Sequence, residues 1–214
     1  MQSGERFTLL SIRGAECRRV KVYTAICGKY PIIRNDIDRF ADVGIFQRPV
    51  MEAKRPKVLS HLFYPDEPIT IWTDANVWLN VTPEEATELL LGDADMALFS
   101  HPFRQTVWQE FGALREQKRF QIQWLQQQLK LQEEAYWRDG LPENTPLYEC
   151  TVLIRRNTES VARAMDAWWS QITRWQWRDQ VSLPYVLWKY KVKTAVHAIN
   201  VREHPMFKHV SQYG

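Results

Sequence analysis

The chain has 214 residues, of which 45% are hydrophobic and 25% are charged. This composition supplies enough apolar side chain for a buried core and excludes wholesale disorder. No apolar run approaches the roughly 20 residues of a membrane-spanning helix, and no secretory signal is visible, so we expect a cytoplasmic protein without a membrane span. The net charge of +3 does not by itself indicate a nucleic-acid partner.

Cysteine usage argues against a disulfide framework and against a zinc cluster. The three cysteines are Cys17, Cys27 and Cys150, an odd number without CxxC spacing. We therefore expect buried free thiols.

Hydrophobic periodicity predicts alternating strands and helices. Strands are expected over residues 20–27, 69–73, 94–99, 150–154 and 194–199. Helices are expected over residues 51–63, 82–91, 105–136, 158–172 and 178–189, with Thr82 as an N-cap and Gly112 as an interruption of the longest one. This alternation is typical of an α/β sheet with helices on both faces, and the absence of repeats or linkers favours one domain over residues 1–214, with a core at about 20–200.

Two polar side chains follow the predicted strand 69–73. Asp74 and Asn76 are two residues apart, so on an extended backbone they point the same way and can bind one hard cation such as Mg²⁺ or Mn²⁺. The alternative is an ordinary turn in which Asp74 caps a backbone amide. In open α/β sheets ligands bind beyond the carboxyl ends of the strands, so residues 24–28 and 74–76 are the first places to expect a site.

Five segments, in order, are similar to motifs of one family. They are residues 21–28 (KVYTAICG), 57–61 (KVLSH), 71–76 (IWTDAN), 101–104 (HPFR) and 178–185 (RDQVSLPY). They resemble a glycosyltransferase-like family that was long catalogued as a domain of unknown function and that includes plant mucilage-related proteins. The similarity covers roughly Lys21 to Lys189.

This resemblance implies a single-domain, GT-A-like (Rossmann-like) α/β fold with a mixed sheet and helices on both faces. It also implies a metal-dependent glycosyltransferase that moves a sugar from a nucleotide-sugar donor, a UDP-sugar above others, to a hydroxyl acceptor. The acceptor would be a glycan or a modified base in DNA.

The resemblance assigns the donor site. Asp74 and Asn76 would hold Mn²⁺ or Mg²⁺, although Asn76 carries less charge than the aspartate usual at that position. His204 would be a further metal ligand, with His209 as its alternative. The nucleotide and its diphosphate would contact a group of polar and small residues, namely Thr24, Ala25, Lys57, Arg104, His61 and His101.

Catalysis is assigned to three residues. Asp179 would serve as a base or would stabilise an oxocarbenium-like centre, with Gln180 beside it and Glu149 as a second carboxylate. The alternative for Asp179 is structural, because an acid at the start of a helix favours the helix dipole without any chemistry.

Other functions stay open on the sequence alone. Ten tryptophans and the basic groups Arg18-Arg19-Lys21 and Arg155-Arg156 are also typical of a non-catalytic nucleic-acid or carbohydrate binding module. Trp168, Trp169, Trp175 and Trp177 either fill the core or form a sugar-stacking platform. The glutamine-rich helix at 105–136 would lie on the surface or pair with a second copy of the chain.

Overall fold

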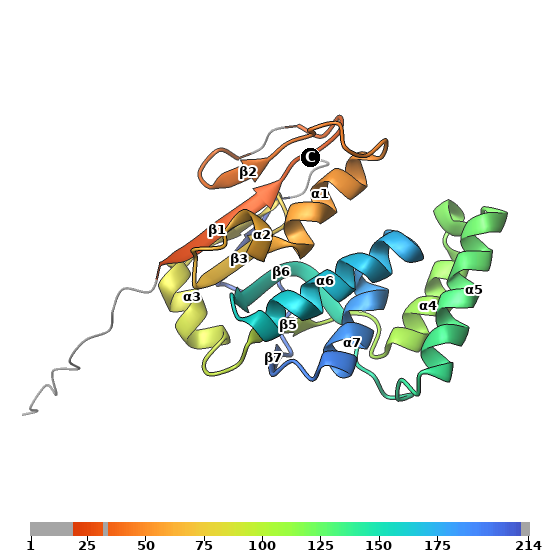
Figure 1. Cartoon of the computed structure of the whole chain (residues 1–214). Helices are drawn as coiled ribbons and strands as arrows, with labels where there is room; N and C mark the ends of the chain where they lie inside the picture. Colours follow the sequence, from red (N-terminus) through yellow and green to blue (C-terminus); the bar gives the residue numbers. More distant parts are fainter. Residues whose placement is uncertain (1–18, 32–33, 211–214) are drawn as a thin grey trace, which may run out of the picture.

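The computed structural model describes residues 19–31 and 34–210, so Cys17 and Arg18 lie outside the described residues. Its centre is a six-stranded sheet in the order β2-β1-β3-β6-β5-β7 (Figure 1). The strands are β1 Val20–Ala25, β2 Asp38–Phe40, β3 Ile69–Thr73, β5 Met96–Ser100, β6 Tyr148–Arg156 and β7 Thr194–His197. β1 is parallel to β2 and β3, β7 is parallel to β5, and β6 runs antiparallel between β3 and β5. The predicted mixed sheet is confirmed.

A second, two-stranded sheet pairs β4 (Val77–Leu79) with β8 (Phe207–His209) in antiparallel register. β4 begins directly after the turn at residues 74–76. This small sheet therefore joins the turn to the last described part of the chain.

The two faces of the large sheet carry different layers. One face is covered by α1 (Pro49–Val58), α2 (Ser60–Phe63), α6 (Glu159–Arg174) and α7 (Asp179–Tyr190), and α4 (Val107–Glu116) and α5 (Gln123–Arg138) extend this layer by packing against α7 (Figure 1). The other packs against α3 (Pro83–Leu90) and the two-stranded sheet. Side chains alternate between these two layers along the strands, as Trp72 and Ile71 do on β3. Helices on both faces are thus confirmed.

Local sequence explains how several helices begin and end. Thr82 caps α3 through a capping box: its Oγ1 accepts from the Glu85 amide at 3.2 Å, and Glu85 Oε2 accepts from the Thr82 amide at 2.8 Å. The predicted helix at 51–63 begins earlier, at Pro49, and is divided at Leu59. The predicted helix at 105–136 is divided at 117–122, with a 3-10 turn at Lys118–Phe120, and Gly112 lies inside α4.

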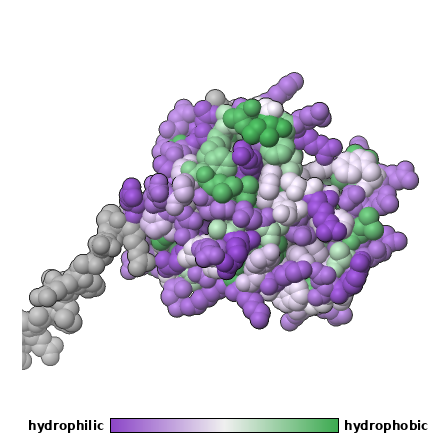
Figure 2. Space-filling model, viewed as in Figure 1, coloured by the Kyte–Doolittle hydropathy of each residue, from purple (hydrophilic) through white to green (hydrophobic). Residues whose placement is uncertain are grey.

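Figure 2 shows a mostly hydrophilic face with an apolar area where α1 and α2 lie in Figure 1. Both helices contribute exposed apolar side chains, Val50 on α1 and Leu62 on α2.

Among the tryptophans, Trp72 and Trp168 are buried, whereas Trp169 and Trp177 are half-buried against the core. Trp168 therefore belongs to the core, whereas Trp169 and Trp177 are only partly covered by it.

In the described residues no helix is both long enough and apolar enough to span a membrane.

Candidate functional site

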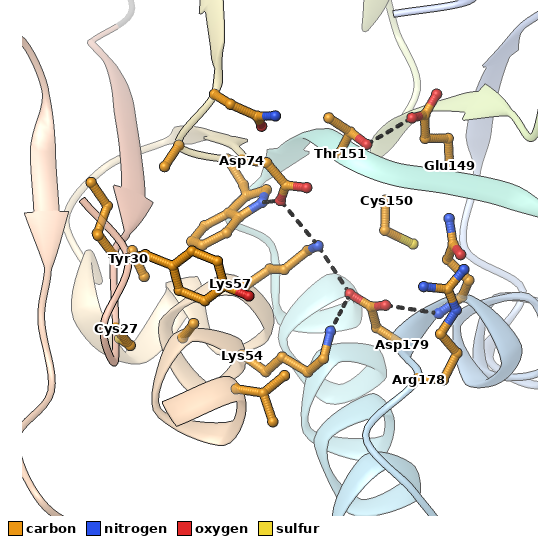
Figure 3. Close-up of a pocket in the computed structure, with 18 of the residues that line it drawn as sticks. Cys27, Tyr30, Lys54, Lys57, Asp74, Glu149, Cys150, Thr151, Arg178 and Asp179 are labelled. Carbon is orange, nitrogen blue, oxygen red and sulfur yellow. Dashed lines mark hydrogen bonds and ion pairs between the residues drawn. The ribbon is translucent and has the colours of Figure 1, made fainter. Parts of the chain in front are cut away.

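A cavity of about 570 Å³ lies where β1 and β3 end, β6 begins and α7 begins. Eight charged side chains line it, and five of them are basic. The basic residues are Lys54, Lys57, Arg104, Arg178 and Arg202, and the acidic ones are Asp74, Glu149 and Asp179. Figure 3 shows Lys54 and Lys57 of α1 pointing toward Asp179 of α7, with Asp74 on the opposite side of Lys57. This excess of positive charge favours an anionic ligand.

The turn at residues 74–76 presents one carboxylate to the cavity. The Asp74 amide donates to the Thr151 carbonyl at 2.8 Å, which fixes the turn to β6. Asp74 Oδ1 accepts from Trp72 Nε1 at 2.9 Å and lies 3.5 Å from Lys57 Nζ. Among the described residues only Oδ1 has such partners, and 41% of the Asp74 side chain is exposed. Oδ2 is thus available to a ligand.

Arg34, which the sequence did not indicate, stabilises this turn through hydrogen bonds on both sides of it. Its buried guanidinium donates from Nη1 to Thr73 Oγ1 at 3.2 Å and to the Val77 carbonyl at 2.5 Å, so it holds the residues on either side of the turn. Asp36 accepts from the other edge of the guanidinium at 2.9 and 2.6 Å. No motif marks Arg34, since its partners are backbone and neighbouring side chains.

Asn76 contacts His209 and not His204. Asn76 Nδ2 lies 3.1 Å from His209 Nε2, and the Asn76 carbonyl accepts from the Val210 amide at 2.9 Å. His204 does not line the cavity, and its Nδ1 accepts from the Met206 amide at 3.3 Å. Over residues 19–31 and 34–210, no group of three or more His, Cys, Asp and Glu side chains is arranged to hold a metal. The oxygen atoms that fit a hard cation are Asp74 Oδ2 and Asn76 Oδ1.

Asp179, the first residue of α7, is buried between two lysines. Its carboxylate lies 2.8 Å from Lys54 Nζ and 2.9 Å from Lys57 Nζ. Burial opposes ionisation, but Lys54 and Lys57 outweigh it and hold the pKa of Asp179 below its usual range. A carboxylate held ionised in this way is a weak proton acceptor and a strong local charge.

The pKa values of Lys54 and Lys57 shift in opposite directions because Lys57 has a second carboxylate nearby. Burial is the largest influence on both and lowers the pKa of Lys54. At Lys57 the combined attraction of Asp179 and Asp74 exceeds burial and raises the pKa. Lys57 is therefore the more firmly charged of the pair.

Glu149 is a buried carboxylate with one free oxygen. Its Oε1 accepts from Thr151 Oγ1 at 2.8 Å and lies 3.5 Å from Arg202 Nε. Its Oε2 has no hydrogen-bond partner among the described residues. Glu149 lines the cavity, and a buried carboxylate oxygen without a partner can accept a proton or a hydroxyl hydrogen bond once a ligand reaches it.

The two described cysteines are free and buried, as predicted, and both line the cavity. Burial raises the pKa of Cys27 to about 11 and also raises the pKa of Cys150. Both thiols are protonated at neutral pH, which disfavours them as nucleophiles.

His101 is held as a neutral imidazole after β5. Its Nδ1 accepts from the amides of Phe103 at 3.2 Å and Arg104 at 3.1 Å. Partial burial, together with the nearby guanidinium of Arg104, lowers the pKa of His101 to about 4. The ring thus fixes the loop that carries Arg104.

The structure brings most of the predicted site residues to one cavity. Those that line it are Ala25, Lys57, Asp74, Asn76, His101, Arg104, Glu149, Asp179 and Gln180. Three do not: Thr24 is fully buried, His61 on α2 pairs with Asp166 of α6 at 3.1 Å, and His204 lies outside the lining. Sequence reasoning missed Lys54 and Arg202, although Lys54 precedes Lys57 by three residues and so shares its helix face.

One curated relative matches part of the chain. "Alkaline ceramidase TOD1" of Arabidopsis thaliana is 25% identical over an alignment of 153 positions, and the match covers 67% of this chain and 32% of that protein. The match thus covers about a third of the relative's length.

Solved structures of three glycosyltransferases are similar at low identity. One acts in glycosylation of the major capsid of PBCV-1 (10% identity, TM-score 0.47, 84% of this chain and 81% of that chain). The others are the galactosyltransferase LgtC with donor and acceptor sugar analogs (10%, 0.40, 68% and 44%) and mouse xyloside xylosyltransferase 1 (15%, 0.37, 70% and 51%).

The family model for the TOD1/MUCI70 glycosyltransferase-like domain matches residues 40–212. The match extends beyond the predicted end at Lys189 and begins after β1, so the segment at 21–28 lies outside it. The expected family is nonetheless confirmed: the chain belongs to the TOD1/MUCI70 glycosyltransferase-like family.

Proposed function

We propose that the chain is a metal-dependent glycosyltransferase that moves a sugar from a nucleotide-sugar donor, preferably a UDP-sugar, to a hydroxyl acceptor. The observation that carries this proposal is the basic cavity that the Asp74–Asn76 turn enters beside Lys57. A nucleotide-sugar has a doubly charged diphosphate as its leaving group, and such a cavity suits it. Membership of a glycosyltransferase-like family supports the same class of reaction.

The donor would lie with its diphosphate over the turn. Asp74 Oδ2 and Asn76 Oδ1 would hold Mn²⁺ or Mg²⁺, which would neutralise charge on the departing diphosphate. Lys57 would approach the same oxygens, since it already lies 3.5 Å from Asp74. Ala25, at the end of β1, would face the nucleoside.

The acceptor would bind near Glu149 and α7. In the transfer, the acceptor oxygen bonds to the anomeric carbon, the bond from that carbon to the diphosphate breaks, and the hydroxyl proton passes to Glu149 Oε2. Asp179 would stay ionised and stabilise positive charge at the sugar. Gln180 Oε1, buried without a partner in the described structure, would accept a hydrogen bond from a sugar hydroxyl.

The test is a thermal-shift panel of UDP, GDP, CDP, ADP and their sugars, each with and without Mn²⁺. We expect one nucleoside diphosphate to raise the melting temperature, Mn²⁺ to increase that shift, and Asp74→Ala to remove the Mn²⁺ increment. Asp166→Ala, which changes an exposed carboxylate on α6, is the matched control. A panel without any shift would contradict the proposal.

Two further assays address other activities. The Arabidopsis relative is named an alkaline ceramidase, but a ceramide has two long alkyl chains, and the charged lining of this cavity does not favour them. If the protein released fatty acid from ceramide and no nucleotide raised its melting temperature, a ceramidase activity would replace the proposed glycosyltransferase activity. Metal-independent nucleic-acid binding that falls steeply with salt would instead favour a binding module.

A further inference from the structure

We propose that Arg104 and Arg178, held by the buried carboxylate of Glu110, form a rigid clamp that binds the donor diphosphate even without a divalent ion. Glu110 is the positioning residue of this clamp. The identity of the ligand rests on the proposed function, whereas the clamp itself rests on the contacts of Glu110 with the two arginines.

Glu110 joins two segments that are far apart in sequence. It lies on α4 with no exposed surface, and its two oxygens face different arginines. Oε2 lies 2.5 Å from Arg104 Nε, in the loop after β5, and Oε1 accepts from Arg178 Nε at 2.9 Å, just before α7. Both arginines also line the cavity. One carboxylate thus fixes the inner edge of both.

The contact through Nε leaves both terminal nitrogens of Arg178 for a ligand, whereas at Arg104 Nη2 lies 3.2 Å from His101 Nε2 and Nη1 is left for a ligand. Among the described residues, the terminal nitrogens of Arg178 have no hydrogen-bond partner, while its backbone amide donates to Gln176 Oε1 at 2.6 Å. Arg104 is held by the loop that His101 closes. A guanidinium fixed at one edge presents its remaining donors in a geometry that matches a phosphate.

The charge balance of the cavity points to the same pair. Lys54 and Lys57 share Asp179, and Lys57 also faces Asp74. Arg202 faces Glu149. Arg104 and Arg178, by contrast, share a single carboxylate, so positive charge is in excess there. A diphosphate has two adjacent phosphate groups, one for each guanidinium.

The first experiment is calorimetric titration of the full chain with inorganic pyrophosphate in the presence of EDTA. We expect wild-type protein to bind, and Arg104→Lys and Arg178→Lys each to lose about tenfold or more in affinity. Lysine retains the charge but has one nitrogen, which cannot contact Glu110 and phosphate as a guanidinium does. Arg115→Lys is the matched control, because Arg115 pairs with Glu133 away from the cavity.

The second experiment asks whether Glu110 positions the two arginines or only neutralises their charge. The two roles predict opposite changes in pyrophosphate affinity for Glu110→Gln. Glu110→Gln removes a negative charge, so if Glu110 were only a counter-charge, pyrophosphate would bind more tightly. If Glu110 positions both guanidinium groups, pyrophosphate binds more weakly to the folded variant, measured below its melting temperature. A variant that unfolds is replaced by Arg104→Gln/Glu110→Gln, which keeps the local charge balance and should also bind weakly.

The outcomes distinguish this proposal from the proposed function. Equal pyrophosphate affinity in wild type and Arg178→Lys, or binding only with Mn²⁺, overturns the clamp and leaves the glycosyltransferase proposal intact. Clamp-dependent pyrophosphate binding without stabilisation by any nucleoside diphosphate supports the clamp and contradicts the nucleotide-sugar donor.

Discussion

Lys57 lies 2.9 Å from the buried carboxylate of Asp179, and this pair joins α1 to the first residue of α7. Lys54 contacts the same carboxylate at 2.8 Å. The position that the sequence assigns to catalysis thus also fixes two helices against each other. Its chemical and structural roles have to be measured separately.

Asp179→Asn is expected to destabilise the protein by about 3–5 kcal/mol, because it leaves two buried ammonium groups without their shared partner. Urea denaturation measures the loss. Adding Lys54→Met to Asp179→Asn removes one of the unpaired charges and should recover part of it. A loss below about 1 kcal/mol in Asp179→Asn would contradict this account of the ion pairs.

His101 should make stability depend on pH. Its pKa is about 4 in the folded chain, below the ordinary value of about 6.5. The folded state therefore prefers the neutral ring, and the resulting stability is fully present above about pH 6.5 and lost as the pH falls through about 4. Burial lowers the pKa of His101 most, and the positive charge of Arg104 is the next largest cause. The charges of Arg178 and Arg202 lower it further, whereas the carboxylate of Glu110 raises it.

The variant for this test is His101→Asn, whose side-chain oxygen can still accept from the backbone amides. The difference in unfolding free energy between wild type and His101→Asn should shrink from pH 7 to pH 4. A difference that stays constant over that range would mean that the imidazole pKa is not lowered.

Glu149→Gln should reduce the rate of sugar transfer by roughly a hundredfold or more, because an amide cannot take up the acceptor proton. Metal-dependent stabilisation by the nucleoside diphosphate should not change. Steady-state kinetics together with the thermal-shift assay separate these effects. Glu143→Gln, in an exposed loop, is the control, and equal kcat in wild type and Glu149→Gln would exclude Glu149 as the base.

Arg34→Lys should weaken the Mn²⁺-dependent part of nucleotide binding, because one ammonium group cannot hold both Thr73 and Val77 around the turn. We expect the Mn²⁺ increment of the thermal shift to fall while the metal-free shift is retained. Arg55→Lys, at an arginine that packs on Phe63 away from the cavity, should leave both unchanged. If Arg34→Lys kept the full Mn²⁺-dependent thermal shift, Arg34 would not be needed to hold the turn in place.

The sequence predicts the parts of this fold that depend on local pattern. β3 and α3 follow from an apolar run and from a capping box around Thr82. β2 and β8 were not predicted, because strands of three residues give no periodic signal. The division near 117–122 contains neither proline nor glycine, so tertiary packing, including burial of Phe120, determines it.

The same distinction applies to the site. Lys57, Asp74 and Asp179, which lie in three of the five motifs, line one cavity, because the end of β3 and the start of α7 meet there and the end of α1 packs beside them. Glu110 was not predicted, because a glutamate inside a helix is typical of a solvated face, and only the fold shows that it is buried between two arginines. Likewise, His209 rather than His204 reaches Asn76 through the pairing of β4 with β8.

That pairing also sets the order in which the cavity can be completed during synthesis. Asn76 and His209 are 133 positions apart, so a ribosome releases the turn long before the strand that secures it. All six strands of the large sheet lie before Phe207. The first five strands of the sheet can therefore pair while Asn76 still lacks its partner, so the contact between Asn76 and His209 is among the last to form at this cavity.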